Sequence, residues 1–381
     1  MIPHLVRSVG LAAFGNIAIG LSWANYAVIV VQYAFQLTGP RYLAGSGSIR
    51  SQSTVFWNIF SVKLLLFVLL AGCAAIVYTV NSPGSSSLMT YFIYTLLPLG
   101  AVFHSGWYLQ SLGYFFIVSV VSIAAAVVSL VVGFMLVHNS QHTVFAASSL
   151  VIGLFFSGIG TFIVSYRLTA KLSLKHCYEH VKTYLNDGWS VFISQFIASI
   201  YMLSGPIIIG WLLDSSSAGA YSAVERLVTS VSSVCLLTHT AAYPKLAALY
   251  TTDRVGYARL LKSVLWIYFA LATICYGLII CAGPYLSAYL FGSNSQAFGT
   301  LIWWGGGLVM LAVFGPLVTG YYVVSGQQQK VYSLTMKVLV ISVILGIPGV
   351  RYLGVWAWFC ALAISQLLVL WTGVQIARKR I

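Results

Sequence analysis

Apolar residues form long stretches along the chain with few charged residues inside them, a pattern typical of helices that cross a membrane. Crossing a hydrocarbon core of about 30 Å takes about 20 such residues. Eleven stretches meet this need, at residues 11–37, 56–80, 89–110, 113–137, 142–166, 189–213, 218–241, 262–283, 298–323, 328–349 and 353–377. The pattern therefore predicts an all-α polytopic membrane protein with about eleven spans.

The composition agrees with helices embedded in lipid. Apolar residues make up 60% of the 381 residues and charged residues only 6%, whereas a soluble domain has about 25% charged residues. The mean hydropathy is +0.94. The six cysteines include no CxxC pair, so we expect them to be small buried apolar side chains.

The basic residues of the chain are concentrated on one side of the predicted membrane spans. The net charge is +14, and 14 of the 19 Lys and Arg residues lie in alternate connections or after the last stretch. Only Arg7 and Arg351 lie on the opposite side. Because basic residues favour the cytoplasmic side, we expect residues 167–188, residues 244–262 and the C-terminus to be cytoplasmic. This distribution argues against a nucleic-acid partner.

The sequence repeats itself at an offset of 204 residues, measured from Gly15 to Gly219. Each of these glycines lies 25 residues before a proline, Pro40 or Pro244, and the apolar stretch that follows superposes at the same offset. Both halves enter the membrane in the same direction. The repeat therefore predicts two lobes related by an axis along the membrane normal.

The repeat also predicts the domain organisation. We expect an N-terminal lobe at residues 1–166, a cytoplasmic linker at 167–188 and a C-terminal lobe at 189–381. Shifting the stretch 189–213 back by 204 residues places its counterpart mostly before Met1. We therefore expect two six-helix lobes, with most of the first helix absent from this chain.

Polar side chains follow one face of each of two helices that the repeat relates. Such a stripe is tolerated where it faces protein or a water-filled cavity rather than lipid. It either joins helices by hydrogen bonds or lines a cleft between the lobes, and the matched positions favour the cleft. The first stripe is Ser22, Asn25, Gln32 and Gln36, and the second is Arg226, Thr229 and Thr240, with the apolar Leu236 at the remaining position.

Basic residues within the apolar stretches predict an anionic substrate. A charge at the bilayer centre is unfavourable by roughly 2.5–3.5 kcal/mol, so each one needs a reason. Lys63 and Lys337 either extend to the membrane interface or face the cleft. Arg226 lies on the second stripe and is suited to bind phosphate. We expect Arg226 to bind the substrate, with Lys63, Lys337 and Arg7 as further positive charge.

Glu225 is the acidic residue that we place inside a span, in a chain with five acidic residues. Burial favours the neutral carboxyl group and nearby cations favour the carboxylate, so its protonation can change with conformation. Glu225 is therefore a candidate for ion coupling. The alternative is that Glu225 only packs against a neighbouring helix. Adjacent helical residues diverge by about 100°, which argues against a simple pair with Arg226.

The sequence gives little support for an enzyme. Residues 176–180 (HCYEH) match a zinc pattern, but they lie in a basic connection without a third ligand, so we expect an interfacial helix and no metal site. No GxxxxGK[ST] motif is present, and we expect no cofactor. A membrane enzyme of polysaccharide assembly would need paired acids or a nucleophile. A cation or drug exporter would need acids in its cavity.

Several short elements occur in a characteristic order along nearly the whole chain. The most specific is Gly219, Tyr221, Ser222, Ala223, Glu225 and Arg226, followed by Pro244; the others are Pro3, Leu5, Arg7, Gly10, Phe14 and Gly15, then Tyr33, Phe35, Arg41 and Ala44, then Trp107 and Gln110, then Phe291 and Gly292. Together they resemble the O-antigen and polysaccharide flippases of the multidrug/oligosaccharidyl-lipid/polysaccharide exporter superfamily. Gln32 stands where that family often has an acid.

The resemblance implies a function that composition alone does not reach. It implies twelve helices and an undecaprenyl-pyrophosphate-linked oligosaccharide as the substrate. This lipid would cross the bacterial inner membrane by alternating access, coupled to an ion gradient. Membrane lipids, a polysaccharide polymerase and a chain-length regulator are the partners that it implies.

Overall fold

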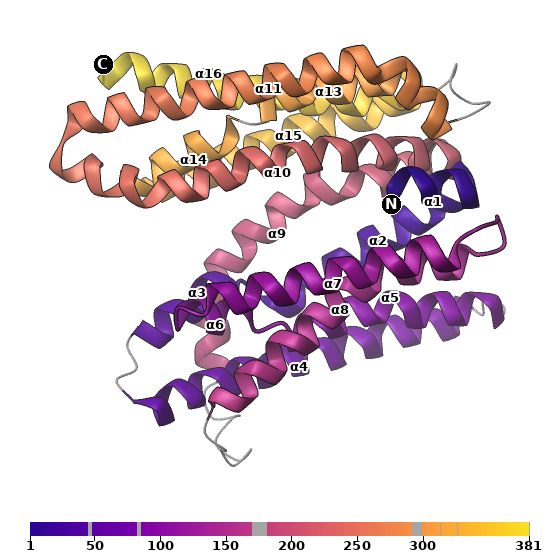
Figure 1. Ribbon diagram of the computed structural model, residues 1–381, viewed down its shortest axis with the longest axis horizontal. Helices are drawn as coiled ribbons and strands as arrows, with labels where there is room; N and C mark the ends of the chain where they lie inside the picture. Colours follow the sequence, from indigo (N-terminus) through magenta and orange to yellow (C-terminus); the bar gives the residue numbers. More distant parts are fainter. Residues whose placement is uncertain are drawn as a thin grey trace. The chain divides into compact units, whose positions relative to one another are not determined.

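The computed structural model describes residues 1–44, 48–81, 85–169, 181–291, 299–312, 314–325 and 327–380. Within these ranges every regular element is a helix (Figure 1). The helices are α1 (Ile2–Val9), α2 (Leu11–Gln32), α3 (Phe35–Ala44), α4 (Ile49–Asn81), α5 (Ser85–Phe103), α6 (Gly106–Ser111), α7 (Phe115–Leu136), α8 (Thr143–Leu168), α9 (Val181–Leu212), α10 (Ser215–Thr252), α11 (Arg254–Phe291), α13 (Thr300–Ala312), α14 (Gly315–Val324), α15 (Gln328–Leu353) and α16 (Trp356–Arg380).

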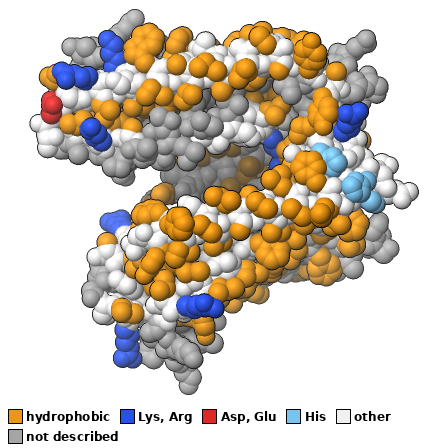
Figure 2. All heavy atoms as spheres, in the orientation of Figure 1, with side chains coloured by type: hydrophobic (Ala, Val, Ile, Leu, Met, Phe, Trp, Pro, Cys, Tyr) orange, Lys and Arg blue, Asp and Glu red, His pale blue; other side chains and the backbone are white. Residues whose placement is uncertain are grey.

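The all-helical architecture confirms the all-α part of the expected fold, and the count of eleven spans stays a prediction. Helices occupy each of the eleven stretches, and eight helical segments in the described ranges are long and apolar enough to cross a membrane. The helix α10, which carries Glu225 and Arg226, is not among those eight. Part of the expected span 218–241 lies outside the residues that this count covers. Hydrophobic side chains cover much of the helix surface in view (Figure 2).

Three of the expected helices are interrupted. The first breaks between α2 and α3, where Tyr33 and Ala34 have φ angles of 43° and 62°. The second breaks between α5 and α6, and the third between α13 and α14. At the third break Pro316 occupies the first turn of α14, where a missing backbone N–H costs no helical hydrogen bond. Residues 244–262, expected as a connection, are instead helical on both sides of Asp253.

The chain forms two compact units. Unit 1 contains Met1 and Ile19–Ser199, and unit 2 contains Ile2–Ala18 and Ile200–Ile381. These limits differ from the expected lobes because two long helices, α2 and α9, each contribute residues to both units.

Close helix packing holds unit 1 together. The helix α8 packs against both α5 and α7, and α6 packs against α3, α7 and α8. At the crossing of α5 and α8, a Cβ added to Gly100 would lie 2.8 Å from the Cα of Phe155. Small residues at such crossings let backbones approach, which stabilises helix pairs in lipid. The buried hydrophobic cluster of unit 1 includes Trp107, Tyr108 and Leu109 of α6.

In unit 2 the N-terminal part of α2 packs closely on the first turns of α10. A Cβ added to Gly15 would lie 2.9 Å from the nitrogen of Gly219, and one added to Gly219 would lie 3.0 Å from the nitrogen of Gly15. Each added Cβ would also overlap a carbonyl oxygen, that of Ser215 for Gly15 and that of Leu11 for Gly219. Elsewhere in unit 2, α10 packs on α11 and α13, and α15 packs on α16.

Candidate functional site

The start of α10 is fixed by side chains that cap and cross it. The Asp214 carboxylate accepts a hydrogen bond from the backbone N–H of Ser217 at 2.8 Å, which makes Asp214 the N-cap of the helix. The Ser215 hydroxyl donates to Oδ1 of Asn16 in α2 at 2.7 Å. Together with the Gly15 and Gly219 crossing, these bonds fix the position of the following residues, 220–227.

Tyr221 anchors this stretch in unit 2. Its side chain is fully buried, its ring centroid lies 4.8 Å from that of Phe359, and its ring lies against the backbone at Gly205. Its hydroxyl donates to Oε1 of Glu225, one turn later, at 3.3 Å. The half-buried Glu225 carboxylate is therefore held by a tyrosine that cannot move without disturbing α9 and α16.

A polar stripe begins at Arg226 and continues toward the C-terminus of α10. Arg226 is half-buried, whereas Thr229, Ser230 and Ser233 are exposed. Thr229 and Ser230 donate to the carbonyl of Arg226 at 3.1 and 2.7 Å, which leaves their oxygen lone pairs turned outward. Spacings of three, four and seven residues place all four side chains on one face. Thr240 lies in α10, and its side chain is outside the described part.

The other basic residues proposed for the site in unit 2 are exposed. Arg7 of α1 lies over the ring of Tyr289, with 5.3 Å between its Cζ atom and the ring centroid. Lys337 of α15 is exposed, and its neighbour Val338 belongs to a small buried cluster. The structure brings Arg7 onto an aromatic face and leaves Lys337 accessible.

The first predicted stripe lies in unit 1 and does not form one continuous helical face. Ser22 is buried, and Asn25 is half-buried and donates to the carbonyl of Leu21 at 2.8 Å. The break after Gln32 puts Gln36 on a separate helix, α3. Nε2 of Gln36 nevertheless donates to Oε1 of Gln32 across the break at 3.2 Å.

The residues between these glutamines have an unusual backbone. Tyr33 and Ala34 both occupy the left-handed region, which non-glycine residues rarely adopt. The Tyr33 hydroxyl donates to the carbonyl of Leu185 at 2.9 Å, and its ring stacks on Phe192 with centroids 4.5 Å apart. These contacts with α9 offset the backbone strain and hold the break in place.

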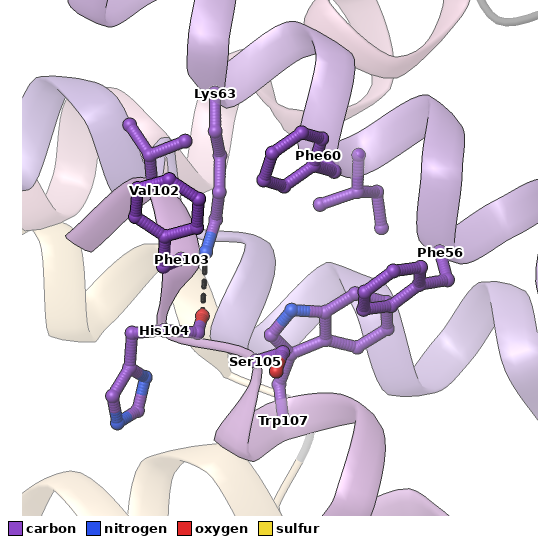
Figure 3. A pocket seen from close by; sticks show the side chains of 9 residues that line it. Phe56, Phe60, Lys63, Val102, Phe103, His104, Ser105 and Trp107 are labelled. Carbon is purple, nitrogen blue, oxygen red and sulfur yellow. Dashed lines mark hydrogen bonds between the residues drawn. The ribbon is translucent and has the colours of Figure 1, made fainter. Parts of the chain in front are cut away.

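Lys63 lies in the interior of unit 1. Its side chain is only 2% exposed, and Nζ donates to the carbonyls of Ala101 and His104 at 3.2 and 2.9 Å. Figure 3 shows the bond to His104. The ammonium therefore does not extend to the interface, one of the two alternatives considered from the sequence. Within the described residues, no group of three His, Cys, Asp or Glu could hold a metal ion, and residues 176–180 (HCYEH) are outside them.

Sequence reasoning did not identify the role of Tyr221, although its spacing to Glu225 was a usable signal. Residues four apart on a helix face each other, and a tyrosine hydroxyl needs a partner when buried. The break at Tyr33–Ala34 carried no comparable signal, because it contains no glycine or proline. At the break between α5 and α6, the pair Ser105–Gly106 is a turn signal that sequence reasoning did not use.

Comparisons with known proteins agree on one family. The model of the family described as "Polysaccharide biosynthesis protein" matches residues 1–250. A protein of Shigella dysenteriae named "Putative O-antigen transporter" is 19% identical over 373 residues, covering 97% of this chain and 92% of its own length. A protein of the same name from Escherichia coli (strain K12) is 23% identical over 270 residues, covering 69% of this chain and 64% of its own.

Solved structures show the same fold. An inward-facing multidrug resistance MATE family transporter of the MOP superfamily superposes with a TM-score of 0.75 at 14% identity, covering 99% of this chain and 94% of that one. The lipid II flippase MurJ, in an inward closed conformation, gives a TM-score of 0.74 at 14% identity, covering 99% and 85%. The relatives and neighbours bear the names of transporters and flippases. This is a multi-pass membrane protein with a transporter fold.

Proposed function

Because the chain belongs to the polysaccharide biosynthesis protein family, we propose that it moves a lipid-linked oligosaccharide across the bacterial inner membrane. The cargo is the undecaprenyl-pyrophosphate-linked repeat unit of an O-antigen or a related polysaccharide, carried from the cytoplasmic to the periplasmic leaflet. The names of the two relatives and the fold shared with a lipid II flippase support this proposal.

The polar stripe of α10 is the observation that carries the proposal. A membrane helix with a guanidinium on one face needs water or a polar ligand beside that face, because lipid cannot satisfy this group. The hydroxyls of Thr229, Ser230 and Ser233 already donate within α10, and their lone pairs can still accept hydrogen bonds. Arg226 can bind a pyrophosphate through two parallel hydrogen bonds, and the hydroxyls of Thr229, Ser230 and Ser233 can bind sugar. We propose that Arg226 binds the pyrophosphate.

We propose that further residues supply charge or polar groups for the same substrate. Exposed Arg7 and Lys337 supply positive charge, and Thr240 extends the stripe of α10. In unit 1, Asn25, Gln32 and Gln36 supply amide groups, and Ser22 is buried. The buried ammonium of Lys63 already has two backbone acceptors, so its charge acts from the protein interior.

We propose that the two halves arose by the parallel repeat and alternate in access to the two sides of the membrane. The contacts of the repeat-related glycines support this, because they are reciprocal. The repeat relates residue 15 to residue 219 and residue 11 to residue 215. The contact of Gly15 with Ser215 therefore corresponds to the contact of Gly219 with Leu11, and both contacts are present. Two equivalent helices that cross on a two-fold axis produce this arrangement. The proposal includes two lobes related by the repeat.

Glu225 is the proposed coupling residue. It lies one residue before Arg226 and accepts a hydrogen bond from buried Tyr221. Water entering or leaving the site would change the balance between its neutral and ionised forms. Protonation could then favour release of the anionic head group. We place the C-terminus in the cytoplasm and expect a polysaccharide polymerase and a chain-length regulator as partners.

Replacement of Arg226 tests the function. We expect Arg226→Ala to weaken binding of a short-chain polyprenyl pyrophosphate by roughly 10- to 150-fold, because a charged hydrogen-bond donor is lost. The affinity of Arg226→Lys should lie between those of Arg226→Ala and the native protein, since lysine keeps the charge but not the planar pair of donors. Binding would be measured on purified protein, and surface glycan in a strain lacking its own transporter.

Arg351→Ala is the matched control, because Arg351 is an exposed arginine near the end of α15 and does not belong to the stripe of α10. Unchanged binding and normal glycan in a well-folded Arg226→Ala protein would remove Arg226 from the site. Glycan polymerisation by the purified protein would instead indicate an enzyme. Efflux of organic cations without any lipid-linked substrate would indicate a drug exporter.

A further inference from the structure

The break between α5 and α6 leaves two backbone carbonyls without their helical donors. In a continuous helix the Ala101 carbonyl would accept from the N–H of Ser105, but that N–H donates to Oγ1 of Thr161 in α8 at 3.2 Å. Likewise the His104 carbonyl would accept from the N–H of Tyr108, which instead donates to the carbonyl of Ser105 at 3.0 Å. Both carbonyls are therefore available to another donor.

Lys63 donates to these same two carbonyls. It lies on α4, a helix that packs on α5, and its side chain runs between Phe60 and Val102 to the break (Figure 3). The ammonium has three hydrogens, and two are used by Ala101 and His104. The third is beside a cavity with room for about one water molecule, lined by Phe56 and Trp107 among others.

We propose that this cluster of carbonyls is a built ammonium site, and that Lys63 is its resident cation. The last carbonyls of α5 carry the negative end of the helix dipole, so a positive charge there is favourable. A buried charge without partners would be strongly unfavourable, and the two carbonyls supply those partners. The site takes a primary ammonium group and has space for a single water beside it.

The site positions α6. Buried Trp107 of α6 lies against the backbone of α3 at Gly39, and Leu109 is fully buried. Gln110 is exposed at the end of the same short helix. Lys63 is therefore a positioning residue for α6 and, through Trp107, for α3. This role is independent of which substrate the protein carries.

Exposure of a buried reporter in α6 tests the proposal. In a protein with all six native cysteines replaced, Leu109→Cys reports access to α6 through its rate of maleimide labelling. Lys63→Met keeps the length of the side chain but removes the charge and its donors. We expect labelling to become roughly tenfold faster, because unpaired buried carbonyls raise the population of opened α6.

Lys182→Met is the matched control, because Lys182 is an exposed lysine of unit 1. It should leave the labelling rate unchanged. Equal protection of Leu109→Cys in the Lys63→Met protein and in the protein with native Lys63 would overturn the proposal, since packing alone would then hold α6.

Chemical rescue tests the class of ligand. Lys63→Ala removes the atoms of a propylammonium ion, so propylammonium should restore protection of Leu109→Cys. Tetramethylammonium at equal ionic strength should not, because it has no N–H donor. If Lys63→Met fails to fold, recovery of folded Lys63→Ala in propylammonium decides the case. Equal protection or recovery in the two salts would contradict an ammonium site.

Discussion

The reciprocal contact of Gly15 and Gly219 makes a quantitative prediction about stability. An alanine Cβ at Gly219 would lie 3.0 Å from the nitrogen of Gly15 and 3.1 Å from the carbonyl carbon of Leu11. An alanine Cβ at Gly15 would lie 2.9 Å from the nitrogen of Gly219 and 2.7 Å from the carbonyl carbon of Ser215. All of these are backbone atoms, which cannot rotate aside. The helices α2 and α10 must therefore move apart to admit either methyl group.

The expected cost is that of overpacking. Inserting one methyl group into such a crossing destabilises a protein by about 1–3 kcal/mol. Because the two contacts are equivalent, Gly15→Ala and Gly219→Ala should lower the free energy of unfolding by similar amounts. The double variant should cost less than the sum of the two by roughly 0.5–3 kcal/mol, because one separation of the helices accommodates both methyl groups.

Unfolding of the purified protein in detergent, followed by circular dichroism against temperature and denaturant, measures these differences. Gly72→Ala in α4 is the control, because nothing lies within 4 Å of its added Cβ. It should be neutral or stabilising by up to about 1 kcal/mol. Two single variants as stable as Gly72→Ala, or strict additivity in the double variant, would refute the close and reciprocal packing of these helices.

Two further predictions concern coupling and topology. Glu225→Gln keeps the acceptor for the Tyr221 hydroxyl but cannot ionise. Transport in proteoliposomes should therefore lose its dependence on pH while the protein stays folded. Transport that is undiminished and still pH-dependent would assign Glu225 to packing. Cysteines placed at Arg167 and Lys262 should react with an impermeant maleimide only from the cytoplasm, and one at Arg351 only from the periplasm, and the opposite result would reverse the topology.

The helices were predictable because each apolar run is long enough to identify without tertiary information. The break between α2 and α3 was not predictable, because Tyr33 and Ala34 adopt a left-handed backbone through contacts with α9, a helix about 150 residues later, and no local residue type signals this. The Asp253 junction between α10 and α11 was missed for a related reason. A single capping residue can separate two long helices, whereas polarity alone suggested a longer connection.

The candidate site was predictable in part. The residue types of Glu225 and Arg226 mark them because ionisable groups are rare in apolar stretches. The environment of Lys63 could not be read from the sequence, since its acceptors are backbone carbonyls that every residue has. Only the diversion of the Ser105 and Tyr108 N–H groups makes those carbonyls available, and that depends on α8 and on the local turn.

The buried lysine also has a consequence for biogenesis. The acceptors of Lys63 lie 38 and 41 residues later in the chain, so at about 5–20 residues per second the ribosome makes them roughly 2–8 s after the lysine. During that interval α4 meets the translocon with an ammonium that has no intramolecular acceptor. A central lysine costs about 2.5–3.5 kcal/mol on the insertion scale, and each leucine, isoleucine, phenylalanine or valine returns about 0.3–0.6 kcal/mol. The many large apolar residues of α4 therefore allow this helix to insert into the bilayer before α5 is synthesised and supplies the acceptors.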